Sequence, residues 1–399
     1  MKILVLNCGS SSIKYKLFNM ESQEIIAQGG IEKIGMKGSF LKFTLPDGQK
    51  VQLEGEILEH RAGIEYILGI LLSEKYGCIK SLKEIDAIGH RVVHGGERFN
   101  SSVLITEEVI DMLEECIELA PLHNPPNLKG IYAIQELLPN IPQVSVFDTA
   151  FHQTMPDYAY MYGLPYSLYE KYGIRRYGFH GTSHRYVSKR ACEFLNVPYE
   201  SQRIITAHIG NGGSITAIKD GKSIDTSMGM TPVEGLIMGT RTGDVDPGVI
   251  SYIMEKEHMR PAGISTLLNK FSGVLGISGI SSDMREIEAG VAENNPRAIL
   301  AMNTYDYRIK KYIGSYAAVL GGVDILVFTG GVGENQWTTR SVVCKNMEYM
   351  GIELDEEINK SVRAKEVVIS KPTSKVKVVI IPTDEELTIA KDTMEILGK

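Results

Sequence analysis

The sequence predicts an α/β protein built from two related halves. Segments typical of strands and of helices alternate along its 399 residues, which is the pattern of α/β domains. Two stretches about half a chain apart, residues 2–18 and 204–219, each read as a strand, a turn of small residues and a second strand. One such hairpin is ordinary, but two in matching contexts predict a duplicated domain.

Length and composition limit the classes of function. The length predicts two or three domains, and 43% hydrophobic with 23% charged residues is ordinary for a globular protein. The formal net charge of −7 argues against a nucleic-acid partner, because nucleic-acid-binding surfaces are usually basic. An anionic substrate stays compatible with this charge, since a few arginines can dominate a cleft.

Cysteine usage and hydropathy indicate a cytoplasmic location. The five cysteines are scattered and form no C-x-x-C pair, which gives no sign of a zinc site or a disulfide framework. The apolar run at residues 3–6 is too short for a signal peptide, and no run is long enough to span a membrane. We therefore expect no membrane partner.

The first domain is predicted over residues 1–150. Its elements follow from apolar periodicity and from turn residues. They are a hairpin at 2–7 and 12–18, a tight turn at Asp47-Gly48, a helix at 54–76, a strand at 85–94, a helix at 106–119 capped by Thr106, a Pro-rich loop at 121–127, a helix at 128–138 and a strand at 143–147.

The second domain is predicted over residues 151–383, and a final helix over 384–399 is expected to return to the first domain. Thr383 and Glu386 have the spacing of a capping box for that helix. The preceding elements begin with an irregular segment at 156–172 and a helix that starts after His180, is capped by Thr182 or Ser183 and runs to Leu195. They continue with the second hairpin, a long helix at 299–320 stopped by Gly321-Gly322, and strands at 324–329 and 376–381.

The hairpin turns and the polar clusters point to phosphate chemistry. A turn of Gly, Ser and Asn exposes backbone N–H groups with little side-chain bulk, which suits a phosphate oxygen. Two facing hairpins are the layout of an ATP-hydrolysing domain pair of the actin and sugar-kinase type. Polar clusters follow several predicted strands, where α/β proteins bind ligands. Taken singly, each cluster residue reads as structural: an ion pair, a turn or a helix cap.

Six motifs together resemble the acetate kinase family. They span the chain and are His90–Gly96 (HRVVHGG), Leu119–Pro125 (LAPLHNP), Phe147–Pro156 (FDTAFHQTMP), Arg175–His184 (RRYGFHGTSH), Met238–Arg241 (MGTR) and Thr329–Asn335 (TGGVGEN). The resemblance implies two duplicated ribonuclease H-like domains around a nucleotide cleft, as in the acetate and sugar kinase, chaperone-ATPase and actin superfamily. It also implies a homodimer.

The reaction that the resemblance implies is reversible, Mg²⁺-dependent transfer of a phosphoryl group from ATP to acetate, giving acetyl phosphate and ADP. Phosphoryl transfer needs in-line positioning and positive charge, which guanidinium groups supply. By resemblance, Arg91 and Arg241 contact the carboxylate and the transferring group, and His180 donates a hydrogen bond to it. Asp148 is the further catalytic carboxylate, and its expected role is to orient Arg91 or another donor in the cleft.

The resemblance also implies the ligands of the metal and of ATP or ADP. Asn7 and Glu385 match the magnesium-linked positions, with Mn²⁺ as the alternative ion; Mg²⁺ takes few protein oxygens. Lys14 is a further phosphate contact. The remaining nucleotide residues fall in three loops: His208, Ile209, Gly210, Asn211 and Gly212; Asp283, Met284 and Arg285; and Gly331, Val332, Gly333, Glu334 and Asn335.

Four apolar residues resemble the pocket for the acetate methyl group: Val93, Leu122, Phe179 and Pro232. A small pocket favours acetate over propionate by about 1–3 kcal/mol. A propionate or other short-chain acyl kinase is therefore the nearest alternative, and a nucleotide-switched chaperone or filament ATPase is a further one. A sugar kinase fits the apolar pocket poorly. Cys8 stands where the family commonly has Ser, and thiol reagents are expected to inhibit if its sulfur is exposed.

Overall fold

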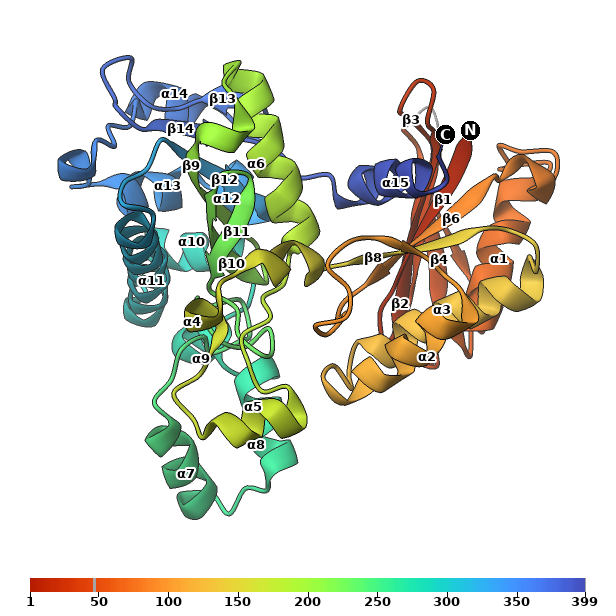
Figure 1. Ribbon diagram of the computed structural model, residues 1–399, viewed down its shortest axis with the longest axis horizontal. Helices are drawn as coiled ribbons and strands as arrows, with labels where there is room; N and C mark the ends of the chain where they lie inside the picture. The colour runs from red at the N-terminus through yellow and green to blue at the C-terminus, as the bar shows by residue number, and fades with distance from the viewer. Residues whose placement is uncertain (46–47, 399) are drawn as a thin grey trace. The chain divides into compact units, whose positions relative to one another are not determined.

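The computed structural model describes residues 1–45 and 48–398, so the predicted turn at Asp47-Gly48 lies outside the described residues. The chain divides into two compact units, one made of Met1–Gln153 with Asp384–Lys399 and the other of Thr154–Thr383 (Figure 1). The predicted domains, residues 1–150 with the helix at 384–399 and a nucleotide-binding domain at 151–383, stay a prediction. The division into compact units does not show which unit binds the nucleotide.

Among the described residues, the first unit contains an eight-stranded sheet in the order β5-β4-β3-β2-β1-β6-β8-β7. Strands β1 to β5 pair antiparallel, and β1, β6 and β8 are parallel neighbours. The strands are β1 Lys2–Cys8, β2 Ser12–Asn19, β3 Glu24–Glu32, β4 Phe40–Thr44, β5 Lys50–Glu54, β6 Ala87–Val92, β7 Val103–Leu104 and β8 Gln143–Phe147.

Helices cover both faces of this sheet. Helices α1 (His60–Leu72) and α3 (Asn124–Leu137) pack on one face, where Leu4, Leu6 and Ile13 belong to their core. Helix α15 (Glu385–Ile396) packs on the other face, against Ile3 and Val5 (Figure 1). The C-terminal segment therefore returns to the first unit because the alternate side chains of β1 need an apolar cover on both faces. Helix α2 spans Glu107–Glu115.

The second unit repeats this topology in the order β11-β10-β9-β12-β14-β13. In both units three antiparallel strands are followed by two strands parallel to the first. The repeat confirms the predicted α/β class and the duplication; the arrangement of the two halves around a cleft stays a prediction. The strands are β9 Arg203–Ile209, β10 Gly213–Lys219, β11 Lys222–Thr226, β12 Ile325–Thr329, β13 Val367–Val368 and β14 Lys377–Ile380.

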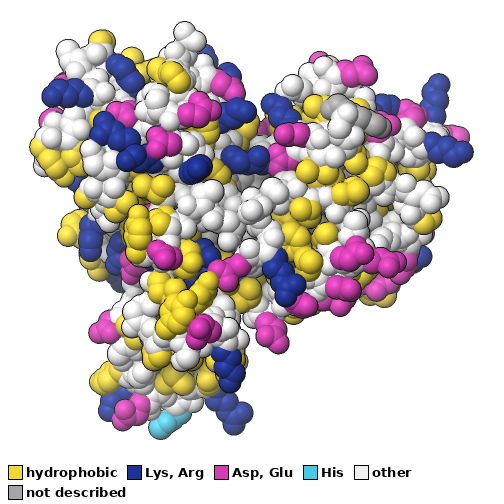
Figure 2. All heavy atoms as spheres, viewed as in Figure 1, with side chains coloured by type: hydrophobic (Ala, Val, Ile, Leu, Met, Phe, Trp, Pro, Cys, Tyr) yellow, Lys and Arg dark blue, Asp and Glu magenta, His cyan; other side chains and the backbone are white. Residues whose placement is uncertain are grey.

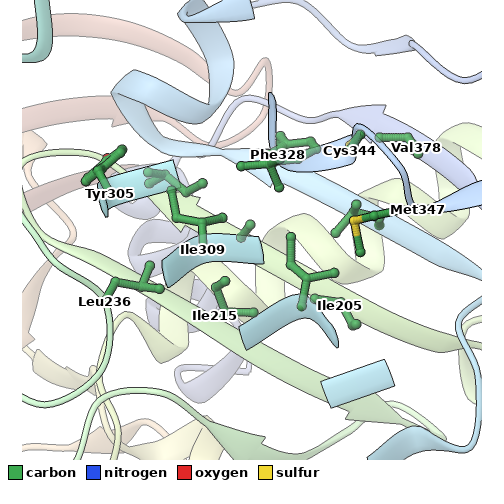
Figure 3. Packing of buried hydrophobic residues seen from close by; sticks show 14 of the residues in the cluster. Ile205, Ile215, Leu236, Tyr305, Ile309, Phe328, Cys344, Met347 and Val378 are labelled. Atoms are coloured by element: carbon green, nitrogen blue, oxygen red, sulfur yellow. The ribbon is translucent and has the colours of Figure 1, made fainter. Parts of the chain in front are cut away.

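Helices α6 and α11 cover the sheet of the second unit (Figure 1). Figure 3 shows the core under α11, where Ile309 lies among Ile205, Ile215 and Phe328. The helices are α4 Asp157–Tyr160, α5 Tyr166–Tyr172, α6 Gly181–Leu195, α7 Pro247–Lys256, α8 Pro261–Lys270, α9 Gly273–Ser278, α10 Met284–Ala292, α11 Pro296–Leu320, α12 Gly330–Asn335, α13 Trp337–Cys344 and α14 Glu356–Ser361.

Two predicted boundaries in the first unit are wrong. The helix predicted at 54–76 begins only at His60, because Glu54 ends strand β5 and the backbone of Ile57 donates to the Ser39 hydroxyl. The predicted loop at 121–127 is already helical from Asn124. Pro125 and Pro126 occupy the first helical turn, where a missing N–H costs nothing.

Three further details in the rest of the chain differ from the predictions. The segment 156–172 contains the short helices α4 and α5 in place of irregular structure. His180 occupies the N-cap position of helix α6 without a capping hydrogen bond from its side chain, and Thr182 and Ser183, the predicted caps, lie inside the helix. The cap of α15 is Asp384, whose side chain accepts from Leu387 N at 3.1 Å, so the predicted Thr383 box does not form.

The surface mixes charged and hydrophobic side chains. Figure 2 shows acidic and basic groups interspersed on the visible face, as expected for a chain with a net charge of only −7. In the described part of the chain, no helix combines the length and apolar character needed to cross a membrane.

Candidate active site

The first unit gathers four predicted site residues at one sheet edge. Asn7 lies near the end of β1, Arg91 near the end of β6, and Asp148 directly follows β8. Because these three strands are parallel neighbours, their carboxyl ends meet at the same edge. Lys14 pairs with Asn7 across the hairpin and is exposed.

Arg91 and Asp148 form a bidentate ion pair. Nε of Arg91 donates to Oδ1 of Asp148 at 2.9 Å, and Nη2 donates to Oδ2 at 2.6 Å. The Asp148 side chain is 2% exposed and that of Arg91 is 23% exposed, so the guanidinium retains an accessible side. Burial alone lowers the pKa of Arg91, but the carboxylates of Asp148 and Glu385 outweigh it and raise the pKa above its usual range. Arg91 therefore stays charged and oriented.

Glu385 lies in the first turn of α15, beside this pair. Its Oε1 is buried and has no hydrogen-bond partner. Burial, with the nearby charges of Asp148 and Glu386, raises the pKa of Glu385 to about 7, although Arg91 and Lys14 act against the rise. An orphaned buried carboxylate oxygen is costly unless a cation or a donor reaches it.

These residues fit a magnesium ion that keeps most of its water. Among the described residues there is no group of three or more His, Cys, Asp or Glu side chains able to hold a metal. Mg²⁺ usually binds one or two protein oxygens together with waters and substrate phosphates. The open oxygen of Glu385 and the amide of Asn7 match that requirement.

The predicted methyl-pocket residues are divided between the units. Val93 follows β6, and its backbone N–H donates to Oδ1 of Asn127 at 3.0 Å. Leu122 lies in the turn before α3 and is 61% exposed. In the second unit Phe179 is buried and Pro232 is half-buried. Val93 and Leu122 therefore belong to the first unit, and Phe179 and Pro232 belong to the second.

The hairpin β9–β10 forms the backbone cradle of the second unit. The N–H of Gly210 donates to the carbonyl of Gly212 at 3.0 Å and closes the turn. Asn211 at the tip is exposed, while its carbonyl accepts from Gly239 N at 2.9 Å. The turn is thus anchored to the segment that leads to Arg241.

His180 has an unusual backbone conformation at the start of α6. Its φ of 56° and ψ of 22° lie in the left-handed region, which a residue other than Gly or Asn occupies at a cost. Its Nδ1 is 2.9 Å from the hydroxyl of Ser214, and its ring stacks on His208 with the centroids 4.3 Å apart. The strain and the stacking fix the direction of the ring.

Two further histidines complete this network. His184 contacts Ser214 through Nε2 at 2.7 Å and Thr206 through Nδ1 at 2.7 Å. The ring of His208 contacts the hydroxyl of Ser183 at 2.8 Å. His184 closes the Arg175–His184 motif, but the sequence analysis predicts no function for it. Ser214 was not predicted as a site residue. The available signal was the alternation of Ser214 and Thr216 with apolar residues in β10, opposite β9.

Arg241 and His180 converge on Gly212. A β-carbon placed on Gly212 would lie 3.4 Å from Nη1 of Arg241 and 3.6 Å from Cε1 and Nε2 of His180. Because Gly212 has no side chain, the guanidinium of Arg241 and the imidazole of His180 both lie next to the hairpin backbone. N–H groups, a guanidinium and an imidazole brought together in this way are able to stabilise an oxyanion.

A cavity of about 810 Å³ opens beside the same hairpin in the second unit. It is lined by predicted nucleotide residues and by five that sequence reasoning missed. The predicted ones are Gly210, Asn211, Asp283, Met284, Arg285, Gly331, Val332 and Asn335. The additional ones are Ser282, Glu288, Gln336, Trp337 and Arg363.

The predicted residues that do not line this cavity have other positions. His208, Ile209 and Gly212 lie along the hairpin. Glu334 holds its own loop, because Oε1 accepts from Gly330 N at 2.9 Å and Thr383 N at 3.1 Å. The carbonyl of Gly333 accepts from Arg340. In the lining of the cavity itself, Asp283 caps α10 and pairs with Arg285 at 2.6 Å.

The whole chain matches one family. Residues 2–391 match the sequence profile of the Acetokinase family. The chain is 70% identical to the acetate kinase of Parabacteroides distasonis, over the full length of both. The crystal structure of Porphyromonas gingivalis acetate kinase superposes with a TM-score of 0.97 at 65% identity, and that of a propionate kinase from Francisella tularensis with 0.92 at 42%, each covering 99% of both chains. The chain therefore belongs to the acetokinase family.

Proposed function

We propose that this chain catalyses reversible phosphoryl transfer between ATP and acetate, giving acetyl phosphate and ADP. Acetate kinases match it at 65–70% identity over its full length, whereas the propionate kinase matches at 42%. The structural observation that carries the proposal is the convergence of Arg241 and His180 on Gly212. A guanidinium and an imidazole beside a backbone cradle are what a migrating phosphoryl group requires.

The nucleophile in this reaction is a carboxylate oxygen of acetate. Acetate is ionised at neutral pH like other simple carboxylic acids, so no general base is needed. The oxygen forms a bond to the γ-phosphorus while the bond from that phosphorus to the β–γ bridging oxygen breaks, and ADP leaves with the electron pair. Arg91, held by Asp148, orients the carboxylate and offsets its repulsion of the phosphate.

Arg241 and His180 act on the charge of the transferring group. The guanidinium of Arg241 contacts its equatorial oxygens, and the imidazole of His180 donates one hydrogen bond to them. His180 is aimed by Ser214 and by stacking on His208, so little reorganisation accompanies the transfer. The reverse reaction uses the same contacts.

Asn7 and Glu385 are the proposed protein contacts of Mg²⁺, with Mn²⁺ as a substitute. When bound, the ion would neutralise charge on the nucleotide phosphates. Lys14 adds a positive charge at the same hairpin. Glu385 contributes a carboxylate oxygen that has no other partner, which supports this assignment.

The cavity in the second unit is the proposed adenosine site. Asn211 and the loop at Gly331 place backbone and amide groups at its wall, and Trp337 offers an aromatic ring. Trp337 is the only tryptophan in the chain, so intrinsic fluorescence reports on this cavity. We expect ATP and ADP to change that fluorescence in a saturable way.

Propionate is the second candidate substrate, on the basis of the propionate kinase structure that superposes at a TM-score of 0.92. We propose Val93, Leu122, Phe179 and Pro232 as the apolar residues that recognise the methyl group and make propionate a slower substrate. One methylene changes binding by about 1–3 kcal/mol. We further propose a cytoplasmic homodimer, which light scattering would detect at about twice the 44.1 kDa chain mass.

The decisive experiment traps the product. Folded protein is incubated with ATP, Mg²⁺ and acetate in the presence of hydroxylamine, which converts acetyl phosphate to a coloured hydroxamate. We expect hydroxamate formation that needs all three components. Absence of hydroxamate from folded protein that still binds ATP at Trp337 would refute the proposed reaction.

A further inference from the structure

We propose that three side chains outside the predicted site, Arg176, Glu234 and Tyr162, form a clamp that sets the size of the acetate pocket. The clamp joins the two segments of the second unit that carry Phe179 and Pro232. These three are positioning residues: they act through the segments they hold and have no contact with substrate assigned to them. The inference rests on the proposed function, because it concerns the carboxylic acid that the site accepts.

Arg176 binds the strand end that precedes the Pro232 segment. Its Nη1 donates to the carbonyls of Thr226 at 3.0 Å, Ser227 at 3.0 Å and Met228 at 3.1 Å. Its Nη2 donates to Oε1 of Glu234 at 2.5 Å. One guanidinium therefore grips this segment at its beginning, residues 226–228, and at Glu234 beyond Pro232.

Tyr162 closes the clamp from the other side of Glu234. Its hydroxyl donates to Oε2 of Glu234 at 2.5 Å and accepts from the backbone N–H of Met230 at 2.9 Å. Both carboxylate oxygens of Glu234 are thus occupied, one by Arg176 and one by Tyr162. Met230, two residues before Pro232, and Glu234, two residues after it, are therefore both bonded to Tyr162.

The two pocket-bearing segments are also joined through their backbones at this point. The N–H groups of Tyr177 and Gly178 both donate to the carbonyl of Gly229, at 3.1 and 3.2 Å. Phe179 follows directly. A β-carbon on Gly229 would lie 1.8 Å from Oε2 of Glu234 and 2.3 Å from the hydroxyl of Tyr162. The clamp therefore fills the space that a side chain at residue 229 would take.

A separate anchor fixes the far end of the Pro232 segment. Oδ1 of Asp244 accepts from Gly235 N at 2.8 Å, and its Oδ2 accepts from the hydroxyl of Tyr312 on α11 at 2.8 Å. Pro232 consequently lies in a short span with both ends held.

Burial makes the clamp rigid. The side chain of Arg176 is 16% exposed and that of Glu234 is 31% exposed. A charged group in such a place is costly when its partner is lost. Burial lowers the pKa of Arg176, but the charge of Glu234 outweighs it and raises the pKa above its usual range, so the guanidinium stays charged.

The chemical consequence concerns a single methylene. Acetate and propionate differ by one CH₂, so discrimination depends on whether the apolar wall can retreat by about one carbon atom. A clamped wall resists that retreat, because the clamp contacts would have to stretch. A loosened wall holds acetate less tightly and accepts propionate more readily.

The test uses Tyr162→Phe and Glu234→Gln, with Tyr199→Phe as the matched control. The Tyr199→Phe variant also loses one half-buried hydroxyl contact in the same unit. That contact is with Ser188 on helix α6, at 2.9 Å. Steady-state kcat and KM are measured for acetate, propionate and ATP. The loss of a hydrogen bond to a charged group predicts that KM for acetate rises about tenfold in the clamp variants.

We further expect the acetate-to-propionate ratio of kcat/KM to fall at least about threefold, a part of the 10–200-fold that one methylene is worth. KM for ATP should stay within about twofold, and Tyr199→Phe should match the wild type. A merely structural role would instead reduce the active fraction, which lowers kcat for both acids equally and leaves every KM unchanged. That outcome overturns the proposal.

Failure of the clamp and failure of the proposed function are distinguishable. A wild type without hydroxamate formation removes the function, whereas an active wild type with unchanged ratios in both variants removes only the clamp. Near-UV circular dichroism confirms folding, and Tyr162→Phe keeps its ring so that at least one variant is well packed. Gly229→Ala is a third test variant, because its methyl group displaces Glu234 without removing any charge. It should also lower the acetate-to-propionate ratio of kcat/KM.

Discussion

The ion pair between Arg91 and Asp148 gives the sharpest test of the site in the first unit. Asp148→Asn keeps the shape of the side chain but removes its charge and turns one of its two acceptors into a donor. One of the two contacts, 2.9 and 2.6 Å long, must then be lost. Because Asp148 is only 2% exposed, water cannot replace the missing acceptor.

The magnitude follows from that geometry. A hydrogen bond to a charged group contributes about 1.5–3 kcal/mol. If the whole of this appears in the transition state, kcat/KM for acetate falls roughly 10–150-fold. KM for ATP should change little, because the cavity that we propose for the nucleotide is lined by residues of the second unit.

Asp324→Asn supplies a matched control. Asp324 accepts from Arg203 with the same bidentate geometry, at 3.0 and 2.7 Å, but at the edge of the other sheet. Coupled assays with acetate and ATP varied separately give the needed constants. An Asp148→Asn enzyme within twofold of the wild type, or an equal loss in Asp324→Asn, would refute the reasoning.

Three further predictions follow from the described residues. Burial raises the pKa of Glu385 to about 7, so without Mg²⁺ this carboxyl contributes stability below about pH 4.5 that is lost as pH rises through 7. Glu385→Gln should therefore raise Tm by about 2–4 °C at pH 8 and leave it unchanged at pH 5. An equal shift of Tm at both pH values, measured by calorimetry, contradicts this prediction. Cys8 is 3% exposed, and burial raises the pKa of its thiol to about 12. Alkylation should therefore reach half-exposed Cys78 first and leave the activity intact, in contrast to the inhibition expected if the Cys8 sulfur were exposed. Early labelling of Cys8, detected by mass spectrometry, would contradict this prediction. Arg241→Ala should lower kcat by roughly 10³–10⁵, the range of arginine fingers, with ATP binding at Trp337 retained, and a loss below about tenfold would remove Arg241 from the reaction.

Local patterns in the sequence were sufficient for the elements that repeat or that have strong caps. The two hairpins, strand β8 and helix α11 with its Gly321 end all depend on neighbouring residues, so they could be read directly. Boundaries failed where a distant partner decides the backbone. Glu54 is in a strand because β4 lies beside it. The hydroxyl of Thr383 is not available for the predicted capping box, because it contacts the hydroxyl of Ser183, 200 positions away, at 2.8 Å.

The composition of the site was legible in the motifs, but its contacts were decided by the tertiary structure. The pairing of Arg91 with Asp148 spans 57 positions and that of Arg176 with Glu234 spans 58, so no local pattern specifies either. The burial of Cys8 likewise depends on α3, where a β-carbon on Gly130 would approach its sulfur to 2.6 Å. Residue type and short-range order determine which chemistry is available, because they act through neighbouring dihedral angles and periodicity. Orientation, burial and pKa come from residues distant in sequence, because they depend on what the folded chain brings within a few ångströms.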